Sequence, residues 1–107
     1  MTRVTVDPGI CGFIATIEVD KVAKHKVKVT ITSDCDQVKE LGQQLTLVEP
    51  WEAVKQHFNC EIYEAASRCH LHVSCPVPVA ILKAIEVETG LALSRDAVIH
   101  FEVVEPE

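Results

Sequence analysis

Two consecutive runs of alternating apolar and polar residues constrain the fold of this chain most strongly. From Phe13 to Asp20 every second side chain is apolar, and Lys26 to Thr32 repeats the pattern with two valines and an isoleucine on one side. A period of two places alternate side chains on opposite faces of a strand. Because only Lys21 to His25 separates the runs, the pattern predicts an antiparallel hairpin with one face on a core.

Three further segments have strand character. Arg3 to Asp7 reads as a strand that ends at Pro8-Gly9, since proline fixes φ and glycine admits left-handed backbone. Leu71 to Ser74 predicts a brief strand before a proline-rich turn. Ala97 to Val103 alternates apolar with mixed side chains, which predicts a final strand.

Helices are predicted between these strands. Ser33-Asp34 supplies good N-cap residue types, so a helix should begin near Cys35, although Gly42 weakens it by up to about 1 kcal/mol. We expect a second helix to start at Pro50, with Trp51 and Phe58 in the core. Ile62 to Arg68 is predicted to be a helical turn or irregular structure. A last helix should run from Pro76 to about Thr89.

This order of elements indicates the fold class. Strands come first, helices are grouped in the middle, and a last strand follows, which favours an α+β two-layer sandwich: a mixed or mostly antiparallel sheet with helices packed on one face. The chain has 107 residues, of which 48% are hydrophobic and 24% charged. This length and composition are typical of one globular domain with one core, spanning residues 1–107.

The net charge excludes some partners. The formal charge is −6, so the attraction that drives binding to nucleic acid or anionic lipid is missing overall. No apolar run approaches the roughly 20 residues of a membrane-spanning helix. We therefore expect a cytoplasmic chain that binds neither nucleic acid nor membrane.

Cysteine placement is the chemically informative feature. The chain has five cysteines, and an odd number in a cytoplasmic chain points to reduced thiols, metal ligands or redox chemistry. Cys11 lies in a glycine-flanked turn, Cys35 at a predicted helix start, and Cys75 just before a proline-initiated helix. A helix start favours the thiolate, which is both nucleophile and metal ligand. Burial as small hydrophobic residues is the structural alternative.

A histidine accompanies the last of these cysteines. His72 and Cys75 form a His-x-x-Cys pair, so Cys11, Cys35, Cys75 and His72 together predict a tetrahedral metal site holding zinc or an iron–sulfur cluster. Cys60 ranks below His72 as the fourth ligand, and Cys69 is expected to be structural.

Two other functions fit the same residues. Cys75 or Cys35 could act as the nucleophile of a thiol enzyme with His72 as its base. Alternatively, the chain is a non-catalytic interaction domain with cysteines as packing residues, including a homodimer joined through an exposed strand edge or a complex with another protein.

Several segments together carry a resemblance to a known family: Pro8-Gly9-Ile10-Cys11-Gly12-Phe13, Ser33-Asp34-Cys35, His72-Val73-Ser74-Cys75-Pro76-Val77-Pro78, Lys83 to Val87, and Gly90 to Leu93. The chain resembles an uncharacterised domain family of small cysteine-bearing proteins found mainly in anaerobic microbes. The resemblance implies no activity. It implies that Cys11, Cys35, Cys75 and His72 are the positions of interest, and an anaerobic setting would suit an oxygen-sensitive cluster.

Overall fold

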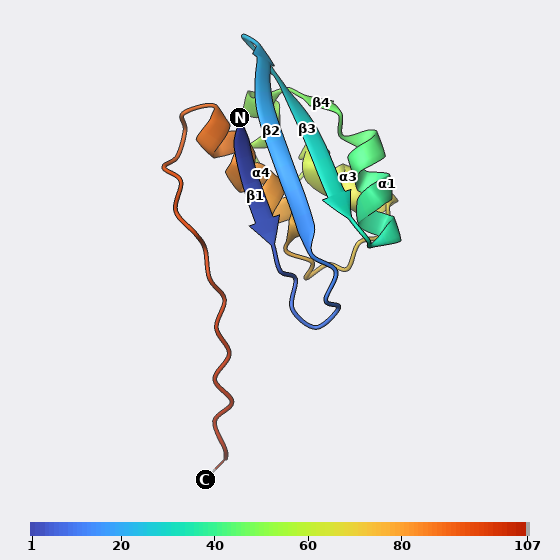
Figure 1. Ribbon diagram of the computed structural model, residues 1–107, viewed down its shortest axis with the longest axis vertical. Helices are drawn as coiled ribbons and strands as arrows, with labels where there is room; N and C mark the ends of the chain where they lie inside the picture. Colours follow the sequence, from blue (N-terminus) through green and yellow to red (C-terminus); the bar gives the residue numbers. More distant parts are fainter. Residues whose placement is uncertain (107) are drawn as a thin grey trace.

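The computed structural model describes residues 1–106 and has two layers, an open sheet and a set of helices on one of its faces (Figure 1). All strand pairs are antiparallel and the strand order is β1-β2-β3-β4. The strands are β1 (Thr2–Val6), β2 (Ala15–Ala23), β3 (Lys26–Ser33) and β4 (Leu47–Val48). The helices are α1 (Asp36–Gln44), α2 (Pro50–Ala53), α3 (Glu61–Arg68) and α4 (Val77–Glu88). The predicted α+β fold is thereby confirmed.

The β2–β3 hairpin forms where the alternating pattern predicts it. Ile17 pairs with Ile31 and Val19 with Val29, so the apolar members of both runs share one face. Ile17 and Val19 are fully buried against the helices. The opposite face carries polar side chains and includes a salt bridge of 2.8 Å between Arg3 Nη2 and Glu18 Oε2. One face of the sheet therefore contacts the core and the other contacts solvent.

The helix layer covers the sheet in two parts. Helix α4 packs on β1 and β2, and α1 packs on β3. Figure 1 shows α4 and α1 behind the sheet, with α3 beside α1. Gly42 of α1 explains the close approach to β3, because a Cβ there would lie 3.2 Å from Cβ of Ile31. The glycine that weakens the helix thus lets it pack tightly on the strand.

Two predicted strands are wrong. Leu71 to Ser74 forms a turn, in which the Cys75 N–H donates to the carbonyl of His72 at 2.9 Å. Ala97 to Val103 is neither strand nor helix, because no other segment among residues 1–106 pairs with it. In Figure 1 the chain after α4 runs away from the body towards the C-terminus.

Two predicted core aromatics are also wrong. Trp51 is 57% exposed and Phe58 is 86% exposed. Helix α2 ends at Ala53, so Phe58 lies outside the helix on which the spacing would have placed both rings on one face. The core is built instead from aliphatic side chains with Cys60 and Cys69 among them.

The remaining helix predictions hold. Cys35 is the N-cap residue of α1, the segment after Cys60 is helical, and α4 ends before Gly90, whose φ of 78° suits a glycine. Within residues 1–106, no helix has both the length and the apolar composition needed to span a bilayer.

Candidate functional site

The strand register brings two of the predicted site residues to the same end of the sheet. Val6 pairs with Ala15, and Ala15 pairs in turn with Ser33, so β1 ends, β2 begins and β3 ends on one line across the sheet. Cys11 lies in the loop that joins β1 to β2, and Cys35 follows Ser33 by two residues. Both cysteines therefore extend from the same edge of the fold.

Helix α4 brings the third cysteine to this edge. Its last residue, Glu88, accepts hydrogen bonds from the Thr2 hydroxyl at 2.7 Å and from the Lys21 N–H at 3.0 Å, at the other end of the sheet. Because α4 packs along β1 and β2, its first turn must lie where those strands end and begin. Cys75 precedes that turn. We call this edge, with Cys11, Cys35 and Cys75, the thiol end.

The three thiols at this edge are close enough for their charges to interact. Burial of Cys75 raises the pKa of its thiol, and negative charge on Cys11 and Cys35 raises that pKa further. A hydrogen bond from the backbone N–H of Val77 at the start of α4 acts in the opposite direction. Such charge effects require nearby groups, so each thiolate at this edge opposes ionisation of Cys75.

Cys35 is held by the start of α1. Its N–H donates to Ser33 Oγ at 3.2 Å, and its half-buried Sγ lies 3.7 Å from Gln37 Oε1. Its side chain makes no capping hydrogen bond to the helix. The sulfur therefore lies near the positive end of the α1 dipole without being used to cap the helix.

Cys11 lies in an open loop. Gly9 and Gly12 flank it with φ of 92° and 73°, and the Gly12 N–H donates to the Gly9 carbonyl at 3.0 Å to close a turn. A Cβ added at either glycine would meet no atom within 4 Å. Cys11 is exposed. The loop thus has free space around it, and its sulfur faces solvent.

His72 is near Cys75 through the chain turn. Its carbonyl accepts the Cys75 N–H, while its side chain is exposed. As the side chains of residues 1–106 are placed, no group of three or more His, Cys, Asp or Glu residues lies close enough to hold a metal ion. The predicted ligands thus share a region of the fold without forming a preassembled coordination shell.

The two other cysteines are core residues. Cys60 and Cys69 are each 1% exposed. The Cys60 thiol donates to the Ala53 carbonyl at 3.0 Å, and burial followed by the charge of Glu40 raises the pKa of the Cys69 thiol. A structural role was expected for Cys69. Cys60, the lower-ranked alternative ligand, is occupied by a core contact next to α2.

The family model that matches this chain covers residues 2–101 and describes a family of unknown function, DUF6951. The chain belongs to this family of unknown function. No curated protein and no solved structure matches the chain. The resemblance seen in the sequence is thereby confirmed for the family, and its association with anaerobic microbes stays a prediction.

The matched region holds the three cysteines of the thiol end and His72. Cys11, Cys35, Cys75 and His72 all fall within residues 2–101. So do residues 97–101, the first part of the unpaired segment after α4. The family description assigns none of them a role.

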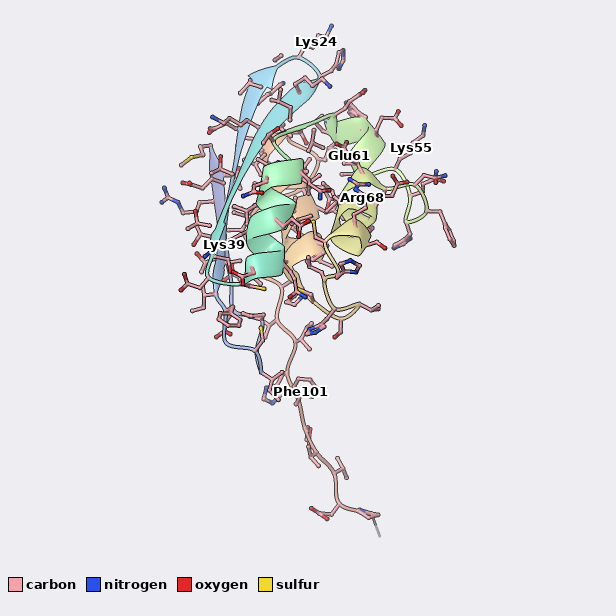
Figure 2. The ribbon with its side chains drawn as sticks, turned by 90° about the vertical axis from the view of Figure 1, so that its right-hand side faces the viewer. Lys24, Lys39, Lys55, Glu61, Arg68 and Phe101 are labelled. Atoms are coloured by element: carbon pink, nitrogen blue, oxygen red, sulfur yellow. The ribbon has the colours of Figure 1, made fainter. Side chains whose placement is uncertain are left out.

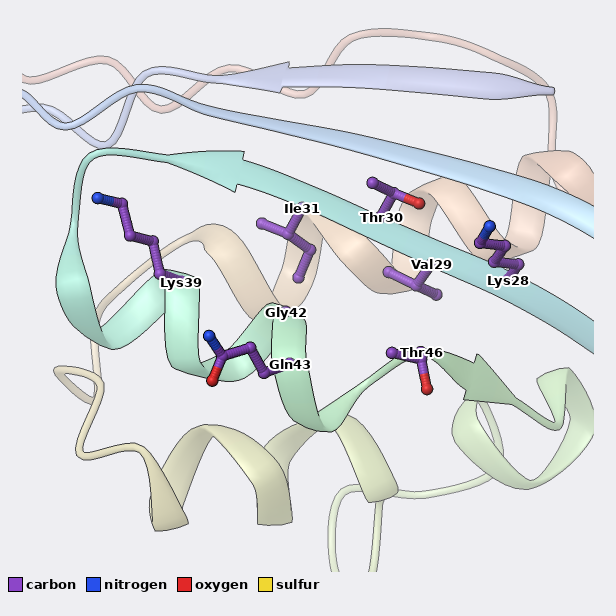
Figure 3. A pocket seen from close by; sticks show the side chains of 8 residues that line it. All are labelled: Lys28, Val29, Thr30, Ile31, Lys39, Gly42, Gln43 and Thr46. Carbon is purple, nitrogen blue, oxygen red and sulfur yellow. The ribbon is translucent and has the colours of Figure 1, made fainter.

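The sequence did not indicate a groove between β3 and α1. This open groove of about 380 Å³ is shown in Figure 3. Gly42 and Ile31, which are in close contact, are among its lining residues, and the side chains of Lys39 and Gln43 stand along its rim. None of the five cysteines lines it. A glycine in a helix facing a strand is the only sequence signal that could have indicated it.

Proposed function

We propose that the thiol end binds a soft metal ion or an iron–sulfur cluster, with Cys11, Cys35 and Cys75 as thiolate ligands and His72 as the fourth ligand. The observation that carries this proposal is the convergence of three cysteines from three separate connections onto one edge of the sheet. None of the three is a fully buried core residue, since Cys11 is exposed and Cys35 and Cys75 are only partly buried against the core. Thiolate and imidazole are ligands that zinc and iron–sulfur clusters prefer.

Charge favours a cation over a lone nucleophile. Burial is the main cause of the raised pKa of the Cys75 thiol, and negative charge on Cys11 and Cys35 adds to it. A thiol enzyme needs a cysteine whose pKa is lowered. A cation among the sulfurs would remove the repulsion and stabilise all three thiolates together. The raised pKa speaks against Cys75 as an activated nucleophile, whereas a bound cation would itself supply the charge that stabilises its thiolate.

The loop between β1 and β2 supplies the adjustment that binding needs. Cys35 and Cys75 are held at helix starts, whereas Cys11 lies in an exposed loop with two glycines at positive φ. As placed, no three of these side chains among residues 1–106 lie close enough to share a metal, so binding would require this loop to adjust.

His72 fits the fourth position by its place in the turn. It precedes Cys75 by three residues, and the hydrogen bond from Cys75 N–H to its carbonyl holds the two residues in one turn. Its exposed imidazole is free to rotate towards the sulfurs. All five cysteines are free thiols, which suits a cytoplasmic setting.

The test is metal analysis of protein purified without oxygen. The wild-type chain should carry zinc, or iron with inorganic sulfide, and an iron–sulfur cluster would show as absorption in the visible range. Cys11→Ser, Cys35→Ser and Cys75→Ser should each lose most of this metal. Cys69→Ala is the matched control, since it removes a thiol from the core and should leave the metal in place.

Two results would overturn the proposal. The first is a wild-type protein that is colourless, free of metal and unable to bind added Zn²⁺ or a reconstituted cluster. The second is equal metal content in wild type and in a triple variant without Cys11, Cys35 and Cys75. Circular dichroism on each variant separates loss of metal from loss of fold.

A further inference from the structure

The segment that follows the helix layer has the pattern of a strand and no partner. We call residues 97–103 the C-terminal segment. Its side chains Val98, Ile99, Phe101 and Val103 are between 83 and 88% exposed. Apolar residues of this size rarely stand in solvent in such a continuous run unless they form an interaction site. This segment therefore needs a binding surface outside its present contacts.

The sheet offers a surface of the matching kind. Strand β1 is at the end of the strand order, so one of its edges has no strand beside it among residues 1–106. An open edge presents unpaired N–H and C=O groups, which an extended segment can satisfy. In Figure 1 the chain after α4 passes on the side of this open edge.

The alternation of the C-terminal segment fits the two faces of the sheet. Strand β1 directs Val6 into the core and Arg3 and Thr5 to the polar outer face. A strand added beside it would direct Ile99 and its alternate neighbours Ala97, Phe101 and Val103 towards the helix layer. Val98, His100 and Glu102 would then lie on the outer face with the polar residues of β1. Pairing therefore buries Ile99, Phe101 and Val103 and leaves Val98 and the polar side chains in solvent.

The placement of the segment argues against pairing within one molecule. Helix α4 ends next to Thr2, at the beginning of β1. The Leu91 and Ala92 N–H groups donate to the Glu86 carbonyl at 2.8 and 3.3 Å, so the chain turns at the end of the helix before it continues. From there it runs away from the body, and Phe101 lies beyond the end of the sheet (Figures 1 and 2). In its own molecule the C-terminal segment therefore does not lie beside the β1 edge.

We propose that the C-terminal segment adds to the open β1 edge of a second copy of this chain, in a reciprocal homodimer. Each copy has one free segment and one free edge, so a two-fold pair satisfies both and leaves neither exposed. A different protein that bound the segment would leave the β1 edge open. The dimer is independent of the thiol end and does not rest on the proposed metal site.

Two adjacent valine and isoleucine positions give a sharp test. Val98 and Ile99 are equally exposed at 83%, but pairing directs only Ile99 to the helix layer. Light scattering after size exclusion, in chelator and reductant, should give twice the chain mass of 11.8 kDa for wild type. Val98→Lys should remain dimeric. Ile99→Lys should raise the dissociation constant at least tenfold, and a chain ending at Asp96 should be monomeric.

Three outcomes would overturn the proposal. One is a wild-type chain that stays monomeric up to millimolar concentration. If truncation at Asp96 then lowered the melting temperature of that monomer, the segment would pair within its own molecule. Another is a dimer that survives truncation. The third is equal weakening by Val98→Lys and Ile99→Lys, since a segment that binds without strand register would not distinguish them.

Discussion

The two ends of the sheet differ in how they are closed. At the end where β1 begins, which we call the hairpin end because the β2–β3 turn lies there, Glu88 joins α4 to Thr2 of β1 and Lys21 of β2. At the thiol end, the β1–β2 loop stands open with Cys11 exposed between two glycines. The same helix thus begins at one end and is fastened at the other.

The hairpin end therefore contributes to the stability of the fold, whereas the thiol end holds the residues proposed for metal binding. Fastening α4 at its last turn fixes the position of its first turn, so Cys75 is presented by a rigid element. The opposing β1–β2 loop has no such fastening, and Cys11 is exposed in it between two glycines at positive φ. The proposed metal site would therefore combine two cysteines at helix starts with one in an exposed loop. Three predictions test this division, beginning with the largest effect.

The first prediction concerns metal-linked stability at the thiol end. If Zn²⁺ binds the folded chain alone, a free concentration of 100 times the dissociation constant should raise the free energy of unfolding by about 2.7 kcal/mol. For a domain of this size that corresponds to a melting temperature higher by about 10 °C or more. Differential scanning calorimetry with and without Zn²⁺ measures the shift.

Matched variants locate that effect. Cys75→Ser should abolish the zinc-dependent shift, and Cys69→Ala should lower the melting temperature of the metal-free protein while keeping the shift. A shift of the same size in both variants would place the metal elsewhere and remove the distinction between the two ends of the sheet.

The second prediction compares a core cysteine with a thiol-end cysteine in the absence of metal. Cys60→Ala removes a buried side chain and leaves the Ala53 carbonyl without its S–H donor, which should lower the free energy of unfolding by about 1–2 kcal/mol. Cys11→Ala removes an exposed group and should change it by less than about 0.5 kcal/mol. Urea denaturation in chelator measures both values.

A larger loss of stability in Cys11→Ala than in Cys60→Ala would contradict the division between the two ends. If Cys11→Ala destabilised the metal-free chain more than Cys60→Ala, the thiol end would contribute to folding. The three thiols would then be packing residues, as in the structural interpretation of the sequence.

Sequence patterns predicted those elements whose interacting segments are adjacent in the chain. The β2–β3 hairpin was predictable because both strands and their turn lie in one continuous stretch. The start of α1 near Cys35 was also predicted, although the N-cap is Cys35 itself, without a side-chain capping hydrogen bond, and not Ser33 or Asp34. Ala97 to Val103 has an equally good strand pattern, but a strand also needs an edge to pair with. The alternation of apolar and polar residues predicts strand character, but it does not show whether a free sheet edge is within reach.

The thiol end shows the same limit. Glycine flanks and helix starts identified Cys11, Cys35 and Cys75 one at a time. Their convergence depends on the register that aligns Val6, Ala15 and Ser33, and on the direction in which α4 crosses the sheet. Neither is encoded in spacing along the chain. The spacing of Trp51 and Phe58 failed for a related reason, because α2 ends before the second ring is reached.

The third and smallest prediction concerns the hairpin end. The pKa of Glu88 is lowered, first by the hydrogen bond from the Thr2 hydroxyl, against partial burial, and then by the Lys21 N–H. A carboxylate whose pKa is lower in the folded chain stabilises the fold above its unfolded pKa of about 4.3 and loses that contribution as the pH falls through the folded value. Glu88→Gln should therefore lower the free energy of unfolding by about 1 kcal/mol at pH 7.

The same carboxylate predicts how that difference changes with pH. The gap between wild type and Glu88→Gln should be constant above about pH 5 and should shrink on further acidification, since wild type then loses the charged acceptor too. Glu86→Gln is the control, because this glutamate is on the same helix and its side chain makes none of the hydrogen bonds found among residues 1–106. It should leave the dependence of the unfolding free energy on pH unchanged. If the difference in unfolding free energy between Glu88→Gln and wild type stayed constant down to pH 3, packing would hold α4 at this end. Cys75 would then be positioned without help from the carboxylate.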